Sequence, residues 1–109
     1  MISPNARALA ECRRRGWPAQ TVEQRIPHTF ITRDLFGVID IVALAGPRII
    51  GIQVTSGSNH AARIAKIAAE PRARAWCEAG GKIEVWSWSK RGAKGKRKVW
   101  TMREQEWTP

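Results

Sequence analysis

Two apolar stretches, Val38-Ile-Asp-Ile-Val-Ala-Leu44 and Ile49-Ile-Gly-Ile-Gln-Val-Thr55, decide the fold of this chain. Both are rich in β-branched residues, which is typical of buried central strands. A short connection that contains Gly46 and Pro47 separates them, and this dipeptide favours a tight turn. The sequence therefore predicts that the two stretches pair as an antiparallel hairpin in the middle of a sheet.

The other elements are expected on both sides of this hairpin. Ser3 and Pro4 form a typical helix start, and Ser56-Gly57-Ser58 supplies a second one. The expected elements are a helix over 4–15, a strand over 21–26, a helix over 59–69 that breaks at Pro71 and continues to Gly80, and strands over 82–89 and 99–103. The order αβββαββ predicts one α/β (α+β) domain over 1–109, in which a mixed sheet lies between helices in three layers.

Composition points to a polyanionic partner. The chain carries 19 Lys and Arg against 9 Asp and Glu, a formal net charge of +10, which indicates a nucleic acid without separating DNA from RNA. No apolar run reaches the roughly 18 residues of a membrane span and no signal sequence is evident, so we expect a cytoplasmic protein that does not bind membranes. Cys12 and Cys77 belong to no metal-binding motif and are expected to be free thiols.

A basic tract lies between the last two expected strands. It holds six cations and two glycines in the nine residues 90–98, which predicts a flexible hairpin turn that contacts phosphates rather than a merely solvated loop. Trp88 beside it is expected either to stack on a base or to pack at the sheet edge. Trp76, Trp86 and Trp100 are expected in the core. The six cations are Lys90, Arg91, Lys94, Lys96, Arg97 and Lys98.

Asp40 is the residue that most needs a chemical explanation. A carboxylate within an apolar strand is costly unless it pairs with a cation or binds a metal. If the hairpin forms, Asp40 and Gln53 converge, and they offer oxygen ligands to a hard cation such as Mg²⁺ (or Mn²⁺), with the Val54 carbonyl as a third. Asp34 is expected either to join this acid group or to make an ordinary loop contact. Glu11 is expected either to approach it or to form ion pairs within its own helix.

The arrangement resembles the PD-(D/E)xK nucleases, in which an Asp on the second strand and an E/Q-x-K on the third form the active site. Asp40 matches the Asp, and Gln53-Val54-Thr55 matches the E/Q-x-K. The resemblance extends over roughly 4–100 and is strongest to small phage-associated and Holliday-junction-resolvase-like members. It implies a restriction-endonuclease-like core, a metal-dependent endonuclease activity on DNA, including branched or structured DNA, and a homodimer.

Thr55 stands where this family has its lysine. Lys66, on the following helix, is expected to supply the missing ammonium group, and Arg63 lies three residues before it on the same helix face. The alternative is that both cations form an ordinary solvated helix face. The expected catalytic residues are Asp40, Gln53, Thr55 and Lys66, and the expected DNA contacts outside the basic tract are Arg33, Ser56, Asn59, His60 and Arg63.

Two other functions stay open at this stage. One is a non-catalytic nucleic-acid-binding module that keeps the nuclease fold without the lysine. The other is a basic RNA- or ribosome-associated protein in which Asp40 is only an ion-pair partner. The relative positions of Asp40, Gln53 and Lys66 discriminate between these possibilities.

Overall fold

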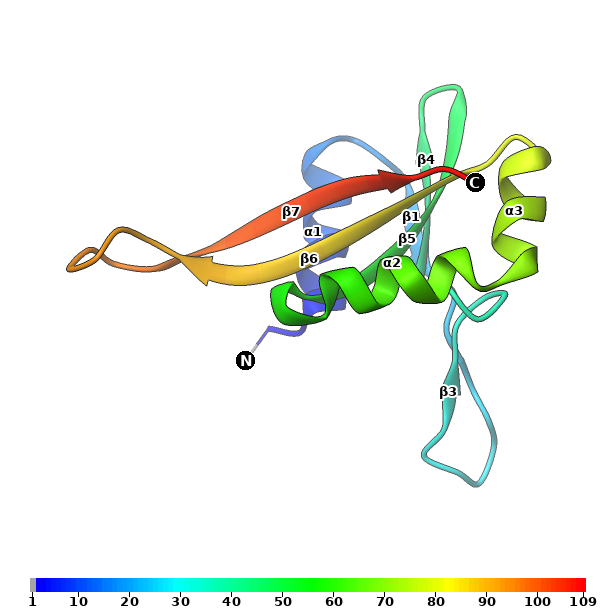
Figure 1. Ribbon diagram of the computed structural model, residues 1–109, viewed down its shortest axis with the longest axis horizontal. Coiled ribbons are helices and arrows are strands. Elements are labelled where there is room, and N and C mark those ends of the chain that lie inside the picture. The colour runs from blue at the N-terminus through cyan, green and yellow to red at the C-terminus, as the bar shows by residue number, and fades with distance from the viewer. Residues whose placement is uncertain (1) are drawn as a thin grey trace.

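The computed structural model describes residues 2–109 as an α+β domain with a five-stranded mixed sheet (Figure 1). Three helices accompany the sheet, and a separate two-stranded hairpin extends from it. In chain order the elements are α1 (Pro4–Arg14), β1 (Ala19–Thr21), β2 (Gln24–Arg25), β3 (Thr32–Arg33), β4 (Ile41–Ala45), β5 (Arg48–Ser56), the 3-10 turn η1 (Gly57–Asn59), α2 (His60–Ala68), α3 (Pro71–Glu78), β6 (Lys82–Arg91) and β7 (Val99–Trp107).

The predicted central hairpin is confirmed. β4 and β5 pair antiparallel with Ile41 opposite Ile52, and Gly46 takes a positive φ of 72° in the turn between them. β5 then pairs with β6 in parallel, and α2 and α3 form the crossover that such a pairing requires. The complete order is β1-β4-β5-β6-β7, so the two strands of the predicted hairpin are internal.

α1 covers one face of the sheet. Ser3 caps the helix by accepting a hydrogen bond from the Ala6 amide at 3.1 Å, and Pro4 occupies the first turn. Ala8 and Cys12 on its inner side are fully buried against the sheet residues Ile41, Ile52 and Trp86. The alternation of side chains along β4 and β5 supplies this apolar face.

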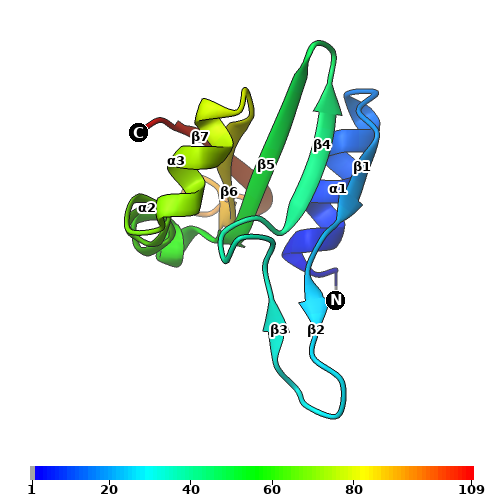
Figure 2. The same ribbon diagram turned by 90° about the vertical axis from the view of Figure 1, so that its right-hand side faces the viewer.

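α2 and α3 cover the opposite face, so the sheet lies between two helical layers (Figure 2). Ile67 of α2 and Ala73 of α3 are buried together with Ile83 and Val85 of β6. Cys77 on α3 is half-buried, and both cysteines are free thiols, as predicted.

Several boundaries differ from the sequence-based expectation. The strand predicted over 21–26 is divided between β1 and β2, and β1 is the part that pairs with β4. Pro71 begins a separate helix, α3, because proline suits a first helical position better than an interior one. The last strand extends to Trp107 rather than ending near Arg103. Trp100 is exposed and its ring contacts Arg7 and Lys90, so its prediction as a core residue was wrong.

Two hairpins project from this body (Figures 1 and 2). One contains β2 and β3 and leaves the sheet between β1 and β4. The other is the outer part of β6 and β7, which carries the basic tract beyond the helical layers. Within residues 2–109 no helix is long and apolar enough to cross a membrane.

Candidate functional site

Asp40 lies directly before β4 and opposite Gln53 of β5. The β4–β5 register ends at Ile41 opposite Ile52, and the Asp40 amide donates to the Ile52 carbonyl at 2.9 Å. Its Oδ2 atom accepts hydrogen bonds from Gln53 Nε2 at 2.7 Å and from the Val54 amide at 2.8 Å. The expected convergence of Asp40 and Gln53 is therefore confirmed, and both side chains are buried, at 5% and 1% exposure.

The backbone before Asp40 is fixed by a close contact across the hairpin. The Ile39 side chain lies directly against Gly51, where an added Cβ would be only 2.6 Å from Ile39 Cδ1. Glycine at this position therefore lets the chain approach β5 closely, and Asp40 follows as the next residue.

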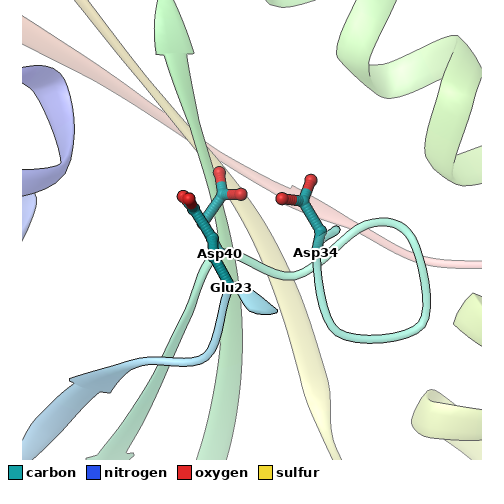
Figure 3. A group of neighbouring side chains, drawn as sticks. All are labelled: Glu23, Asp34 and Asp40. Carbon is teal, nitrogen blue, oxygen red and sulfur yellow. The ribbon is translucent and has the colours of Figure 1, made fainter. Parts of the chain in front are cut away.

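Three carboxyl groups meet at this point, from Glu23, Asp34 and Asp40, with ligand oxygens within 4.8 Å of one another. Figure 3 shows that Asp34 and Asp40 lie on one connection and Glu23 on another segment, and that the Asp34 carboxyl faces the other two. The Val22 amide donates to the Asp40 carbonyl at 2.8 Å, which brings Glu23 to the cluster. Asp34 thus joins the acid group, the first of its two expected placements.

Burial raises the pKa of Asp40 to about 8, and the hydrogen bond and negative charge of Asp34 act in the same direction. The hydrogen bond from the Val54 amide opposes this rise only in part. Without a cation, the cluster therefore retains a proton at neutral pH, because crowded and buried carboxylates cannot all ionise. A divalent cation would remove this conflict by replacing the proton with positive charge.

The neutral side chain of Gln53 also indicates that a ligand belongs at this cluster. Its Nε2 atom is engaged by Asp40 and lies 3.5 Å from Asp34 Oδ2, while its Oε1 atom is buried and has no hydrogen-bond partner within residues 2–109. A buried oxygen without a partner is costly. The acids meet the Nε2 side of this amide, so the three carboxyl groups are the oxygen ligands in place for Mg²⁺ or Mn²⁺, and they fit the metal that the sequence predicts. Val54 lines the same site and its amide donates to Asp40 Oδ2, while its carbonyl as a third metal ligand stays a prediction.

The three acids of the cluster line an open cavity of about 580 Å³. Four cations line the cavity with the acids: Arg33, Arg63, Lys66 and Arg72. Lys66 forms an ion pair with the cluster, with its Nζ atom 3.4 Å from Asp34 Oδ2. A cavity lined by both acids and cations can hold a metal ion and a phosphate group together.

The structure does not bring all the predicted residues to this cavity. Thr55 is buried on the same face of β5 as Gln53 but is not among the residues that line the cavity. Ser56 and Asn59 hydrogen-bond each other at the start of the helical layer, outside the cavity. Glu11 pairs with Arg14 and Arg15 on α1, which covers the other face of the sheet, and is no ligand of this site.

His60 corrects a further prediction. Its side chain is buried, with Nδ1 2.7 Å from Ser87 Oγ and Nε2 2.8 Å from Gln105 Oε1. With both ring nitrogens occupied inside the protein, His60 cannot serve as the surface contact to phosphate that the sequence predicted.

The basic tract forms the exposed end of the β6–β7 hairpin, as predicted, and lies apart from the cavity. Its residues do not line the cavity, so any contribution to binding is made at a second place on the molecule. The cations concerned are Lys90, Arg91, Lys94, Lys96, Arg97 and Lys98.

Sequence reasoning missed Glu23 and Arg72 as parts of the site. Glu23 fell within an expected strand, and only the pairing of β1 with β4 places it beside Asp40. Arg72 was expected on a continuation of the preceding helix, whereas the separate helix α3 turns it toward the cavity. The one available signal was that an acid next to a strand paired with the Asp40 strand must lie near Asp40.

Searches of family models, of curated proteins and of solved structures find no match to this chain.

Proposed function

We propose that this protein is a metal-dependent endonuclease-like enzyme that acts on DNA, including branched or structured DNA. The observation that carries the proposal is the buried cluster of Glu23, Asp34 and Asp40 beside the partnerless Gln53 oxygen. A nucleic-acid module that only binds would gain nothing from three acids that repel its polyanionic ligand. A phosphodiesterase needs such acids, because they hold the metal that the phosphate then meets.

The element order supports a restriction-endonuclease-like core. After the small β2–β3 hairpin is set aside, the chain runs α1, β1, β4, β5, α2 with α3, β6 and β7. Asp40 and Gln53 then lie at the second and third of these strands, as the resemblance implies. A parallel pairing of β5 and β6 through a helical crossover agrees with the same core.

Glu23, Asp34 and Asp40 would hold the metal, and Mg²⁺ or Mn²⁺ suits these ligands. When bound, such an ion polarises a phosphodiester and lowers the pKa of a bound water.

The protein groups have their own roles beside this. Lys66 and Arg63 would neutralise the non-bridging phosphate oxygens from α2, and the Gln53 and Val54 N–H groups hold Asp40 in place.

A nucleic-acid partner is favoured by the net charge of +10 and by the projecting basic tract, and DNA in particular by the resemblance to the PD-(D/E)xK nucleases. With this arrangement the basic tract would bind the DNA phosphate backbone at one place, and the acid cluster would cleave it at another. The second candidate function, a binding module without activity, is favoured by one observation: Lys66 is already paired with Asp34 at 3.4 Å, so it is not a free replacement for the lysine absent at Thr55.

The test is cleavage of end-labelled four-way junction, duplex and single-stranded DNA by the purified chain with Mg²⁺ or Mn²⁺. We expect the wild type to cut at least the junction, Asp40→Asn to be inactive, and Lys66→Ala to be slower by about a hundredfold, because a positioned cation is worth a few kcal/mol in such sites. Arg48→Ala, which removes an exposed cation at the far turn of the sheet, is the matched control and should cut normally. If no substrate is cut with either metal but DNA still binds, the module without activity is the correct function.

A further inference from the structure

The β2–β3 hairpin has an ordered tip that none of the roles above uses. The Ile26 amide donates to the Ile31 carbonyl at 3.0 Å across the turn. The Thr29 hydroxyl donates to the Ile26 carbonyl at 2.8 Å and accepts from the Ile31 amide at 3.2 Å. His28 takes a positive φ of 62°, which an ordinary loop residue avoids. The turn is therefore held in one shape by its own hydrogen bonds.

This turn presents a large aromatic side chain to solvent. Phe30 is 97% exposed and its neighbour Ile31 is 56% exposed, while the Arg25 guanidinium lies 5.8 Å from the centre of the Phe30 ring. Single exposed apolar residues are common, but a Phe with almost no protein contact at the end of a projecting hairpin is well placed to contact a ligand. The ring offers a stacking face and the adjacent guanidinium offers a phosphate contact.

The position of the hairpin relates this tip to the acid cluster. Glu23 stands directly before β2 and Asp34 directly after β3, so two of the three carboxylates are at the base of the hairpin. Four residues of extended chain from Asp34 to Phe30 span about 13 Å. One DNA strand advances about 3.4 Å per nucleotide along a duplex axis, so the tip reaches about three to four nucleotides from a phosphodiester held at the cluster.

We infer that Phe30 stacks on an unpaired base about three to four nucleotides from the cleaved bond, and that the hairpin thereby selects DNA with an exposed base over continuous duplex. The inference rests on the proposed nuclease function. Inserting an aromatic ring into intact duplex requires unstacking a base step, which costs a few kcal/mol, whereas a gap or a branch point already offers an open base face. The hairpin would therefore discriminate by structure and not by sequence.

The surroundings of Phe30 favour a base over a protein partner. Arg25 lies beside the ring, and no acid stands between Arg25 and Arg33 along the chain. A second copy of the chain, which also carries +10, would bring like charge to this place. A nucleotide brings one negative charge beside an aromatic face, which matches the Arg25 and Phe30 pair.

The experiment measures binding without cleavage, in chelator, by fluorescence anisotropy on two DNAs of equal length: an intact duplex and a duplex with a gap of three nucleotides. We expect Phe30→Ala to weaken binding to the gapped DNA about tenfold and to leave duplex binding within about twofold, because stacking on one base is worth about 1–3 kcal/mol. Phe30→Trp should retain the preference, Phe30→Leu should lose most of it, and Ile49→Ala, which removes an exposed apolar side chain at the opposite turn of the sheet, should change neither affinity.

A second readout locates the contact. In the wild-type complex, 2-aminopurine placed at successive gap positions should change in fluorescence most at the position that contacts Phe30, and the change should vanish with Phe30→Ala. Equal affinities of Phe30→Ala and wild type for the gapped DNA, or a change from dimer to monomer on substitution, would overturn the inference and leave the nuclease proposal standing. Absence of all DNA binding by the wild type would overturn both proposals. Absence of cleavage with a normal gap preference would overturn the nuclease function and the stated distance to a cleaved bond, and would leave only the stacking of Phe30 on an unpaired base.

Discussion

Replacing Asp40 by Asn should make the metal-free protein more stable. Asn keeps an oxygen that can accept from Gln53 Nε2 and the Val54 amide, which Asp40 Oδ2 now accepts at 2.7 and 2.8 Å. Its amide nitrogen can donate to the carboxyl groups of Glu23 and Asp34, where Asp40 now adds a third acid. The substitution therefore retains the hydrogen bonds and removes the electrostatic conflict.

The size of the effect follows from the pKa of Asp40. Burial raises this pKa from 3.8 to about 8, so the folded protein keeps a proton that the unfolded chain releases above pH 3.8. Unfolding thus becomes progressively easier as pH rises from about 4 to 8, and at pH 7 the penalty is at most about 4 kcal/mol. We expect Asp40→Asn to raise the free energy of unfolding by about 2 to 4 kcal/mol in chelator at pH 7.

Metal should offset most of this difference in stability between the wild type and Asp40→Asn. A ligand present at a hundred times its Kd stabilises a fold by about 2.7 kcal/mol, which for a chain of this size raises Tm by about 10 °C. We expect that shift in the wild type with Mg²⁺ or Mn²⁺ and none in Asp40→Asn, measured by circular dichroism melting. Glu78→Gln, on the exposed side of α3, is the control and should keep the shift. A less stable Asp40→Asn protein in chelator, or one that retains the metal shift, would refute this reasoning.

Two other predictions concern charge. Neutralising Lys94, Lys96, Arg97 and Lys98 together to Gln should reduce the slope of log affinity for duplex DNA against log salt by up to about 3.5, because each phosphate contact contributes about 0.9. The control variant, Arg48→Gln with Arg74→Gln, should leave the slope unchanged. An unaltered slope in the fourfold variant would exclude the basic tract from the interface. Glu84 is 7% exposed and accepts a hydrogen bond from Trp86 Nε1 at 2.9 Å, and burial raises its pKa from 4.5 to about 7, so this group lowers the free energy of unfolding as pH rises from about 4.5 to 7. In chemical denaturation, the free energy of unfolding of Glu84→Gln relative to wild type should increase by up to about 3 kcal/mol between pH 5 and 8. A difference that does not depend on pH would contradict this assignment.

The part of the fold that was predictable from the sequence is the part that local patterns determine. The β-branched runs around Gly46-Pro47 specify the central hairpin, and the cap at Ser3 specifies the start of α1. The β2–β3 hairpin was not predicted, because its strands have two residues each and its turn is stabilised by the Thr29 side chain rather than by a recognisable turn sequence.

In the candidate site, too, the residues that local patterns place were predictable and those that long-range pairing places were not. Asp40 and Gln53 were predictable because they face each other across one hairpin, where register follows from the turn. Glu23 was not, because its approach depends on the long-range pairing of β1 with β4. His60 was misplaced because its surroundings, Ser87 and Gln105, belong to strands 27 and 45 residues away along the chain.

His60 also anchors the helix that carries Lys66, whereas two of the acids lie on connections between strands. Its two hydrogen bonds join the first turn of α2 to both β6 and β7, and Lys66 follows six residues later, about 9 Å along the same helix axis. The ammonium group is therefore carried on an element that is tied to two strands. Glu23 and Asp34 instead lie on connections at the two ends of a hairpin, where small backbone adjustments are inexpensive. Metal ions of different radius would thus be accommodated by small movements of Glu23 and Asp34, while the Lys66 ammonium group keeps its position.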